Sequence, residues 1–384
     1  MMSSCTLLAL VQSKILPLAG AIIGFSLLIV VHELGHFLFC KLFGIHTPTF
    51  SVGFGPTLWG LEKKIGQTTF KIAKFPLGGY VEIAGLAEPG QGEQQFAKDT
   101  SAASFDKKPY WQKFLVLSGG IIFNLAFAYL VACFLFMVGS SNKNIMITKI
   151  RDSSAAQTAG LKAGDKLLKV NNYDLSTAEN YPKLLEIIQQ NPNQTITLEV
   201  LSLDTTAARE ISITLDEKIF EDKKVGAMGA YFELPIPRLP FFQAIRQGIA
   251  QTNMWIYSTA YSFKMLFAQR SLEGAGGPIQ IMAQMFNQAQ YGILPLLIFL
   301  ALISINLALI NLLPLGVTDG GQLFFATVEA IIRRPAPEWL RIGVNIISIG
   351  LFVILFAYLT YKDIVSVFGS TLANLYNKIM LLFS

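Results

Sequence analysis

The stretch GAIIGFSLLIVVHELGH, residues 20–36, decides how this chain folds and where its chemistry lies. Its first part is almost entirely apolar, and with its neighbours it is long enough for a helix that crosses a bilayer, which needs about 20 residues. His32 and His36 stand at i and i+4, so both imidazoles leave the same face of such a helix. This spacing is typical of a metal site, with Glu33 beside the open coordination position as a general base.

The apolar setting strengthens this interpretation of H-E-x-x-H. An ionisable side chain at the centre of a bilayer costs about 2.5 to 3.5 kcal/mol on insertion scales. The motif places three such residues within five positions of an apolar run, so they need a compensating role. Metal binding supplies one, whereas the ordinary alternative of a solvated charged face is not available in lipid.

The composition is that of a membrane protein with a modest extramembrane part. Hydrophobic residues make up 52% of the chain and charged residues 14%, and the mean hydropathy is +0.49. The net charge of +5 is small for 384 residues, so no nucleic-acid partner is expected. The cysteines Cys5, Cys40 and Cys133 form no C-x-x-C pair, which argues against a disulfide framework or a thiolate zinc site.

Four segments are apolar and long enough to cross a bilayer. A further amphipathic tract at 241–268 predicts an interfacial helix, and residues 372–383 resemble it. Lys and Arg are frequent in the loops after the first and third spans, so both loops are predicted to be cytoplasmic. The N-terminus and the region between the second and third spans then lie outside. The predicted spans are residues 15–40, 113–138, 291–313 and 341–361.

Two regions predict β structure. After the first span, residues 50–55 and 68–75 alternate like strands and lead into P-L-G-G-Y-V at 76–81, so a small sheet or hairpin is expected. Its paired glycines could let an extended substrate peptide add as a strand, although an ordinary turn fits the pattern equally well. Residues 141–235 carry frequent charges and short β-rich runs around a helical run at 179–190, which predicts one soluble α+β domain.

A catalytic zinc site normally has three protein ligands, so a third must be found. The remaining histidine, His46, lies beyond the end of the first span, and the metzincin position six residues after His36 is Leu42. The strongest candidate is Asp319, in N-L-L-P-L-G-V-T-D-G-G at 311–321, where proline and paired glycines break the helix at membrane depth. The alternative for Asp319 is the N-cap of the following helix.

Asn124 is the other polar candidate, in S-G-G-I-I-F-N at 118–124 near the start of the second span. Its amide could hold a substrate carbonyl or fix a metal ligand. It could also simply hydrogen-bond between helices, which is the commoner use of asparagine in membranes. Asn306 and Asn311 in the third span carry the same ambiguity.

Taken in order, these motifs resemble the site-2 proteases, a family of zinc intramembrane proteases, in the bacterial form with a single PDZ domain. The resemblance implies an α-helical polytopic membrane protein with a four-transmembrane-helix zinc protease core, a membrane-associated β element and an inserted α+β PDZ domain. It covers nearly the whole chain and rests on matches at residues 32–36, 43–45, 50–56, 76–81, 276–279 and 311–321.

By that resemblance His32, His36 and Asp319 are the ligands of a Zn²⁺ ion and Glu33 is the general base. The chain departs from the family pattern at Thr318, where leucine is usual, and at Ile121, where proline is usual. Neither departure removes a metal ligand. The residues that the resemblance assigns to substrate binding are Gly78, Gly79, Tyr80 and Asn124.

The implied function is that of a zinc-dependent intramembrane endopeptidase of the bacterial inner membrane. Its substrates would be single-span membrane proteins such as anti-sigma factors or remnant signal peptides, cut toward the cytoplasmic side. Residues 153–171 resemble a PDZ core, with Ser154 where proline is typical, and this domain would lie on the periplasmic side and take peptide termini or filter by size. The expected regions are 1–140, 141–235, 236–290 and 291–384.

An alternative is a non-catalytic PDZ-bearing membrane scaffold with a structural or vestigial metal site. Such a site would be closed by a fourth ligand, and the sequence offers no Cys or His for it. A metal transporter is weaker still, because a single site near one membrane face gives no relay of polar groups across the bilayer.

Overall fold

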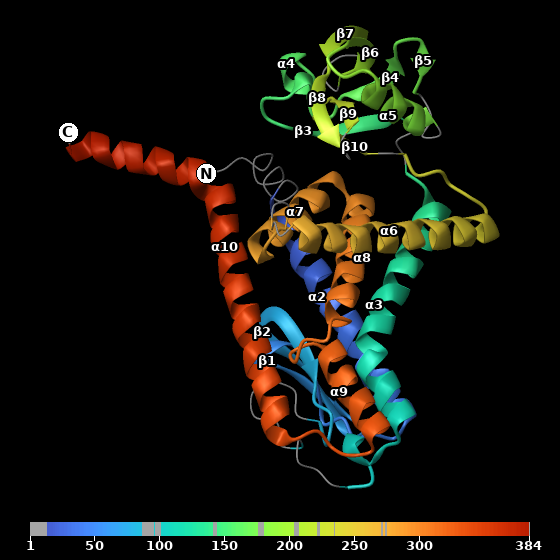
Figure 1. Ribbon diagram of the computed structural model, residues 1–384, viewed down its shortest axis with the longest axis vertical. Coiled ribbons are helices and arrows are strands. Elements are labelled where there is room, and N and C mark those ends of the chain that lie inside the picture. Colours follow the sequence, from blue (N-terminus) through green and yellow to red (C-terminus); the bar gives the residue numbers. More distant parts are fainter. Residues whose placement is uncertain are drawn as a thin grey trace. The chain divides into compact units, whose positions relative to one another are not determined.

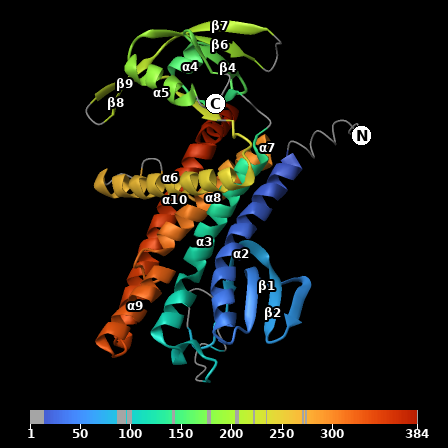
Figure 2. The ribbon, with the colours of Figure 1, turned by 90° about the vertical axis from the view of Figure 1, so that its right-hand side faces the viewer.

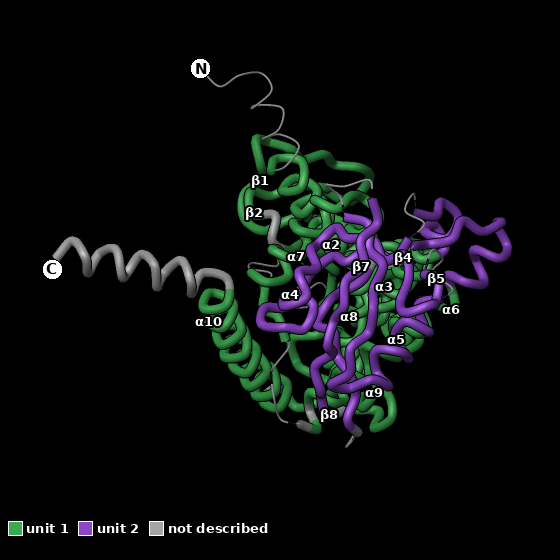
Figure 3. Tube along the Cα trace, turned by 90° about the horizontal axis from the view of Figure 1, so that it is seen from above, with its two compact units in different colours: residues 1–132, 249–384 green, residues 133–248 purple. Residues whose placement is uncertain are grey.

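The computed structural model describes residues 14–86, 96, 101–140, 144–175, 180–202, 207–220, 223–233, 235–269, 272 and 275–383. The chain divides into two compact units, which Figure 3 shows in different colours. The first consists of Met1–Ala132 and Ile249–Ser384 and is mostly helical, and the second is Cys133–Gly248 and is mostly β (Figure 1).

Four helices of the structure are long and apolar enough to cross a membrane, by length and composition, and they match the four predicted spans. The last of them continues through residues 372–383 instead of ending near 361, because no proline interrupts it. These helices are α2 (Leu16–Leu42), α3 (Tyr110–Val138), α8 (Ile293–Asn311) and α10 (Glu338–Phe383).

Three further helices complete the helical part: α6 (Phe241–Gln269), α7 (Pro278–Tyr291) and α9 (Asp319–Ile332). The predicted amphipathic tract is indeed one helix, α6, and its interfacial position stays a prediction. Helix α7 packs against α2 and α8 through a buried apolar cluster that includes Leu28 and Met285. This cluster holds the N-terminal part of α2, while the metal-site motif lies in its C-terminal half.

The predicted β element is present as β1 (Thr49–Ile65) and β2 (Thr68–Val81), an antiparallel pair beside the lower half of α2 in Figures 1 and 2. Both strands curl, so that residues 50–52 pair with the start of β2 on one side and with residues 79–81 on the other. Phe37 of α2 packs edge-on against Phe50 and Phe70, with ring centroids 5.4 and 5.6 Å away. These aromatic contacts hold the sheet against the helix that carries the histidines.

Helix α10 is tied to the start of α7 by two adjacent polar residues. The Asp363 carboxylate is buried and accepts hydrogen bonds from the backbone N–H groups of Gly277 and Gln280, at 3.0 and 2.9 Å. It therefore caps helix N–H groups that have no partner within α7. Lys362 donates through Nζ to the carbonyl of Leu272 at 2.7 Å.

The second unit contains a six-stranded sheet in which β10, β3, β4, β6 and β7 are neighbours in that order and β5 pairs with β4. The predicted β-rich runs are strands of this unit and the predicted helical run at 179–190 is α5, although the start of that run lies outside the described residues. The short strands β5, β8, β9 and β10 were not predicted. The elements are β3 (Ile145–Ile150), α4 (Ala155–Thr158), β4 (Lys166–Val170), β5 (Tyr173–Asp174), α5 (Tyr181–Gln190), β6 (Thr195–Leu201), β7 (Ala208–Thr214), β8 (Asp216–Phe220), β9 (Lys223–Ala227) and β10 (Ala230–Glu233).

Candidate metal centre

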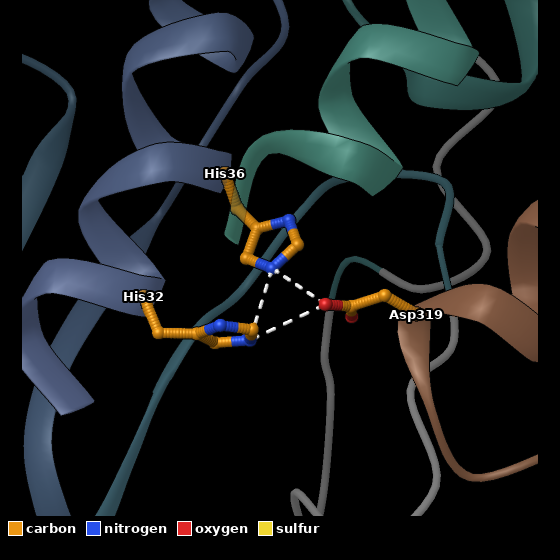
Figure 4. A group of neighbouring side chains, drawn as sticks. All are labelled: His32, His36 and Asp319. Carbon is orange, nitrogen blue, oxygen red and sulfur yellow. Dashed lines mark hydrogen bonds and ion pairs between the residues drawn. The ribbon is translucent and has the colours of Figure 1, made fainter. Parts of the chain in front are cut away.

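Three side chains predicted to bind zinc converge on one point of the first unit. His32 and His36 project from α2, and Asp319 is the first residue of α9 (Figure 4). The two histidine Nε2 atoms are 3.3 Å apart, and they lie 3.3 and 3.4 Å from Oδ2 of Asp319. The structure therefore brings together residues that are almost 300 positions apart in the chain.

The spacing of these three atoms fits a tetrahedral zinc site. Zinc binds histidine nitrogen and carboxylate oxygen at about 2.0 to 2.2 Å, and tetrahedral ligands at that distance are about 3.3 to 3.6 Å from one another. The observed separations of 3.3, 3.3 and 3.4 Å form such a triangle. Oδ2 of Asp319 is also a buried oxygen without a hydrogen-bond partner of good geometry. The residues present thus fit the metal.

The electrostatics of Asp319 suit a metal ligand. Burial alone would raise the pKa of its carboxyl, but the neighbouring His36 and His32 hold this pKa below its ordinary value. The side chain is therefore a carboxylate at neutral pH. Carboxylate oxygen is one of the ligands that zinc prefers.

A backbone carbonyl sets the proton position on His36. Its Nδ1 lies 2.8 Å from the carbonyl oxygen of Val116 in α3. A carbonyl oxygen only accepts hydrogen bonds, so Nδ1 carries the proton and Nε2 keeps its lone pair toward Asp319. Outer hydrogen bonds of this kind orient histidine ligands in most metal sites.

The corresponding contact of His32 is made by Asn124, which is completely buried. Nδ2 of Asn124 lies 3.1 Å from Nδ1 of His32, while Oδ1 of the same amide has no hydrogen-bond partner. If His32 binds metal through Nε2, its Nδ1 carries a proton and needs an acceptor. A half turn of the amide, whose two ends have nearly the same shape, places Oδ1 on that proton and satisfies both groups.

Glycines allow α2 and α3 to approach closely enough for this arrangement. A Cβ atom on Gly35 would overlap the backbone of Gly119, and one on Gly120 would overlap the rings of His32 and His36. Small residues at helix crossings permit such contacts in membranes. The run Ser-Gly-Gly before Asn124 thus lets both imidazoles lie against α3.

The loop that carries Asp319 is held by neighbouring polar groups. Thr318, not Asp319, is the N-cap of α9, and its Oγ1 accepts a 3.4 Å hydrogen bond from the N–H of Gly321. The same hydroxyl donates to the carbonyl of Leu313 at 2.7 Å, and Ser348 of α10 accepts a 2.8 Å hydrogen bond from the N–H of Gly316. The capping alternative for Asp319 is therefore wrong, since Thr318 fills that role and leaves the carboxylate to face the histidines.

Strand β2 passes beside Glu33. A Cβ atom on Gly79 would lie 3.7 Å from Cγ of Glu33, and the backbone of Val81 also lies near the Glu33 carboxyl. Gly78 has a φ of +138°, and the ring of Tyr80 is stacked on that of Phe54. The structure thus brings residues 78–80 next to the predicted base, and their role in substrate binding stays a prediction.

Other polar candidates lie elsewhere. His46 Nδ1 is 3.3 Å from the side-chain oxygen of Gln67, and Asn306 donates to the carbonyl of Leu302 in its own helix. The sequence reasoning missed the carbonyl of Val116 and the hydroxyl of Ser348, because a backbone acceptor and a lone serine leave no recognisable pattern. The glycines at 119 and 120 did carry a signal, since paired glycines inside an apolar helix mark a close crossing.

Comparison with known proteins agrees with this geometry. The model of peptidase family M50 matches residues 20–356 of the chain. The chain belongs to peptidase family M50. This is the site-2 protease family, so the family inferred from the motifs is confirmed, while the PDZ domain stays a prediction. Membership makes the chain a zinc metalloprotease of the membrane, with the His-His-Asp group as its candidate metal site.

Related proteins named as zinc metalloproteases match this M50 peptidase over most of its length. The one from Clostridium perfringens is 30% identical over 347 residues, which cover 90% of this chain and 97% of the relative. The one from Nostoc sp. is 32% identical over 355 residues, covering 87% and 94%. The one from Rickettsia conorii is 31% identical over 349 residues, covering 89% and 96%.

Proposed function

We propose that this zinc metalloprotease is an intramembrane endopeptidase that cuts the transmembrane segments of single-span membrane proteins. The main observation behind the proposal is the triangle of His32, His36 and Asp319, in which both histidines project from an apolar helix long enough to span a bilayer. A protease that acted only in water would gain nothing from placing these residues there. Anti-sigma factors and remnant signal peptides are the proposed substrates, by analogy with the family.

The proposed chemistry assigns one role to each residue. His32, His36 and Asp319 would hold the metal, and a zinc ion there would act as a Lewis acid that polarises a carbonyl and makes water a stronger acid. Glu33 takes a proton from the attacking water and later passes one to the leaving amine. Its carboxyl lies on the turn of α2 that carries the first histidine, next to β2.

The proposed substrate platform is the end of β2. A peptide bond within a helix is shielded by its hydrogen bonds, so cleavage needs a locally unwound segment. Residues 79–81 pair with residues 50–52 on one side, and no described strand pairs with their other side. An extended peptide adding to this edge would be held by main-chain hydrogen bonds beside Glu33.

The second unit is proposed to be a PDZ domain that takes peptide termini or filters substrates by size. Its mixed α and β composition and the sequence of residues 153–171 support this proposal. The proposed location is the bacterial inner membrane, by analogy with the family. The distribution of Lys and Arg supports an orientation with this unit on the periplasmic side and the metal centre toward the cytoplasm. In the described part of the chain the metal group has three members, which leaves a position open and disfavours a closed structural site.

The test is a cleavage assay on the full-length protein in proteoliposomes, with a tagged single-span protein as substrate. We expect one cut inside the transmembrane segment, located by mass spectrometry of the products. Stripping the metal with a chelator should abolish the cut, and one equivalent of Zn²⁺ should restore it. Cleavage only in the flanking soluble segments, or cleavage that persists without metal, would contradict the proposal.

We further propose that the Asn124 amide accepts a hydrogen bond from Nδ1 of His32 and so positions this ligand. Asn124→Leu keeps the side-chain volume but removes the acceptor. We expect zinc affinity to fall by about 10- to 100-fold, as for other outer-sphere partners of metal ligands. Asn124→Asp, which keeps an acceptor, should restore most of it. Competition with a chromophoric chelator measures the affinity.

Asn306→Leu is the matched control, because that amide donates a hydrogen bond to the backbone of its own helix and belongs to neither the metal group nor its partners. It should bind zinc like the unaltered protein. If Asn124→Leu binds zinc normally and instead raises KM, the amide contacts substrate and the positioning role is wrong.

A further inference from the structure

A pocket of about 370 Å³ lies in the first unit between α3, α9 and α10. Tyr110 and Lys113 of α3, Phe325 and Glu329 of α9 and Arg341 of α10 contribute to its wall. None of the three metal ligands lines it. The hydroxyl of Tyr110 is 2.9 Å from that of Thr327, which ties α3 to α9 at the rim.

The pocket carries a surplus of positive charge. The acid that α9 contributes to the wall, Glu329, is already paired, since Arg341 and the backbone N–H of Ala336 both donate to its Oε1. Among the residues that the structure describes, the other basic side chains of the wall form no ion pair. The basic lining residues are Lys113, Arg333, Arg334 and Arg341, and the acidic ones are Asp106 and Glu329, which leaves two positive charges in excess.

One of these arginines occupies a conformation that favours glycine. Arg333 ends α9 in the left-handed region, with φ +57° and ψ +29°. Glycine or asparagine is usual at such a helix end, and another residue there is held in a sparsely populated conformation. A glycine at this position would end the helix with less backbone strain. The arginine is therefore explained best by a role of its side chain.

The position of the pocket along the helices matches the depth of lipid headgroups. Trp111 near the start of α3 and Trp339 near the start of α10 are 55% and 73% exposed, and such aromatic residues mark the membrane interface. Exposed apolar side chains continue along α9 beside the basic lining, with Phe324 at 54% and Ile331 at 76%. A ligand with an anionic head and apolar chains would meet both surfaces at once.

We propose that this pocket binds a phosphate group, namely that of an anionic phospholipid headgroup, with Arg333 and Arg334 as its main donors. Guanidinium groups bind phosphate oxygens in pairs, through a planar fork of N–H donors. Basic pockets between transmembrane helices on the cytoplasmic side are suited to such headgroups. The bound lipid would bridge the ends of α3, α9 and α10.

The experiment is native mass spectrometry of the full-length protein in neutral detergent. The protein is titrated with phosphatidylglycerol, with phosphatidylcholine of the same chains, and with inorganic phosphate. We expect one phosphatidylglycerol to bind at least tenfold more tightly than phosphatidylcholine. Binding of inorganic phosphate without a preference for phosphatidylglycerol would overturn the lipid as the source. Absence of binding in all three titrations would overturn the site itself.

Two double variants distinguish an effect on headgroup binding from an effect on the orientation of the protein in the membrane. Arg333→Gln with Arg334→Gln should abolish the preference for phosphatidylglycerol. Arg333→Lys with Arg334→Lys keeps the charges that orient the protein in the membrane but loses the paired donors, so the affinity should fall several-fold while insertion is unchanged. The matched control is Lys63→Gln with Lys64→Gln, on β1 and outside the pocket, which should bind the lipid normally. Equal loss in this control would show that overall charge, not the pocket, attracts the lipid.

Discussion

Replacing Glu33 by glutamine should abolish cleavage while leaving zinc in place. Glutamine has almost the same shape as glutamate but cannot accept the proton of the attacking water. General base catalysis contributes about 10²- to 10⁴-fold, so kcat should fall by at least about a hundredfold. The proposed zinc ligands His32, His36 and Asp319 are untouched, so the metal content measured by atomic emission should stay at one equivalent.

The matched control for this variant is Glu210→Gln, an exposed acid of β7 in the second unit. It should retain both zinc and activity. Normal turnover of a single-span substrate by Glu33→Gln would show that another group takes the proton, and the assignment of the base would fail.

Removing the carboxylate of Asp319 should lower zinc binding, whereas Glu33→Gln should leave it unchanged. Asp319→Ala leaves two imidazoles, and a site with two protein ligands binds zinc far more weakly than one with three. We expect the affinity to fall by more than the factor of about 100 that marks the upper end for outer-sphere changes. Thr318 supplies the N-cap of α9, so the helix should form normally and its circular dichroism should be unchanged.

Asp152→Ala, on the surface of the second unit, is the control and should leave zinc affinity unaltered. Unchanged zinc binding in Asp319→Ala would place the third ligand elsewhere. A lower affinity together with loss of helical signal would instead point to misfolding, and Asp319→Asn, which keeps the shape of the side chain, would then distinguish the two causes.

The spans and the ligand triangle could be predicted because the signals are local or chemically rare. A run of apolar residues predicts a spanning helix from its own composition, and His32 and His36 define a site by their spacing alone. Asp319 could be chosen because an acid beside proline and paired glycines at membrane depth has few other uses. The fold around it, with Thr318 as the cap, could not be predicted from that pattern.

The features that could not be predicted from the sequence depend on which segments of backbone, far apart in the chain, come into contact. The carbonyl of Val116 becomes the partner of His36 only because Gly35 and Gly119 let two helices meet at that height. The alternation of residues 50–55 and 68–75 predicted strands, but not that β1 curls until both ends of β2 pair with it. The strands β8 and β9 are rich in charge and β10 has only four residues, so none of the three gives a clear alternating pattern in the sequence.

Helix α10, the fourth candidate span, is attached to the rest of the first unit at two points along its length. Ser348 fixes the loop that leads to Asp319, and Asp363, fifteen residues later, fixes the beginning of α7. At 1.5 Å per residue these attachments are about 22 Å apart along one continuous rod. The thickness of the surrounding bilayer influences how steeply such a rod is tilted. A change in the tilt of this rod would therefore reach both the loop before Asp319 and the start of α7.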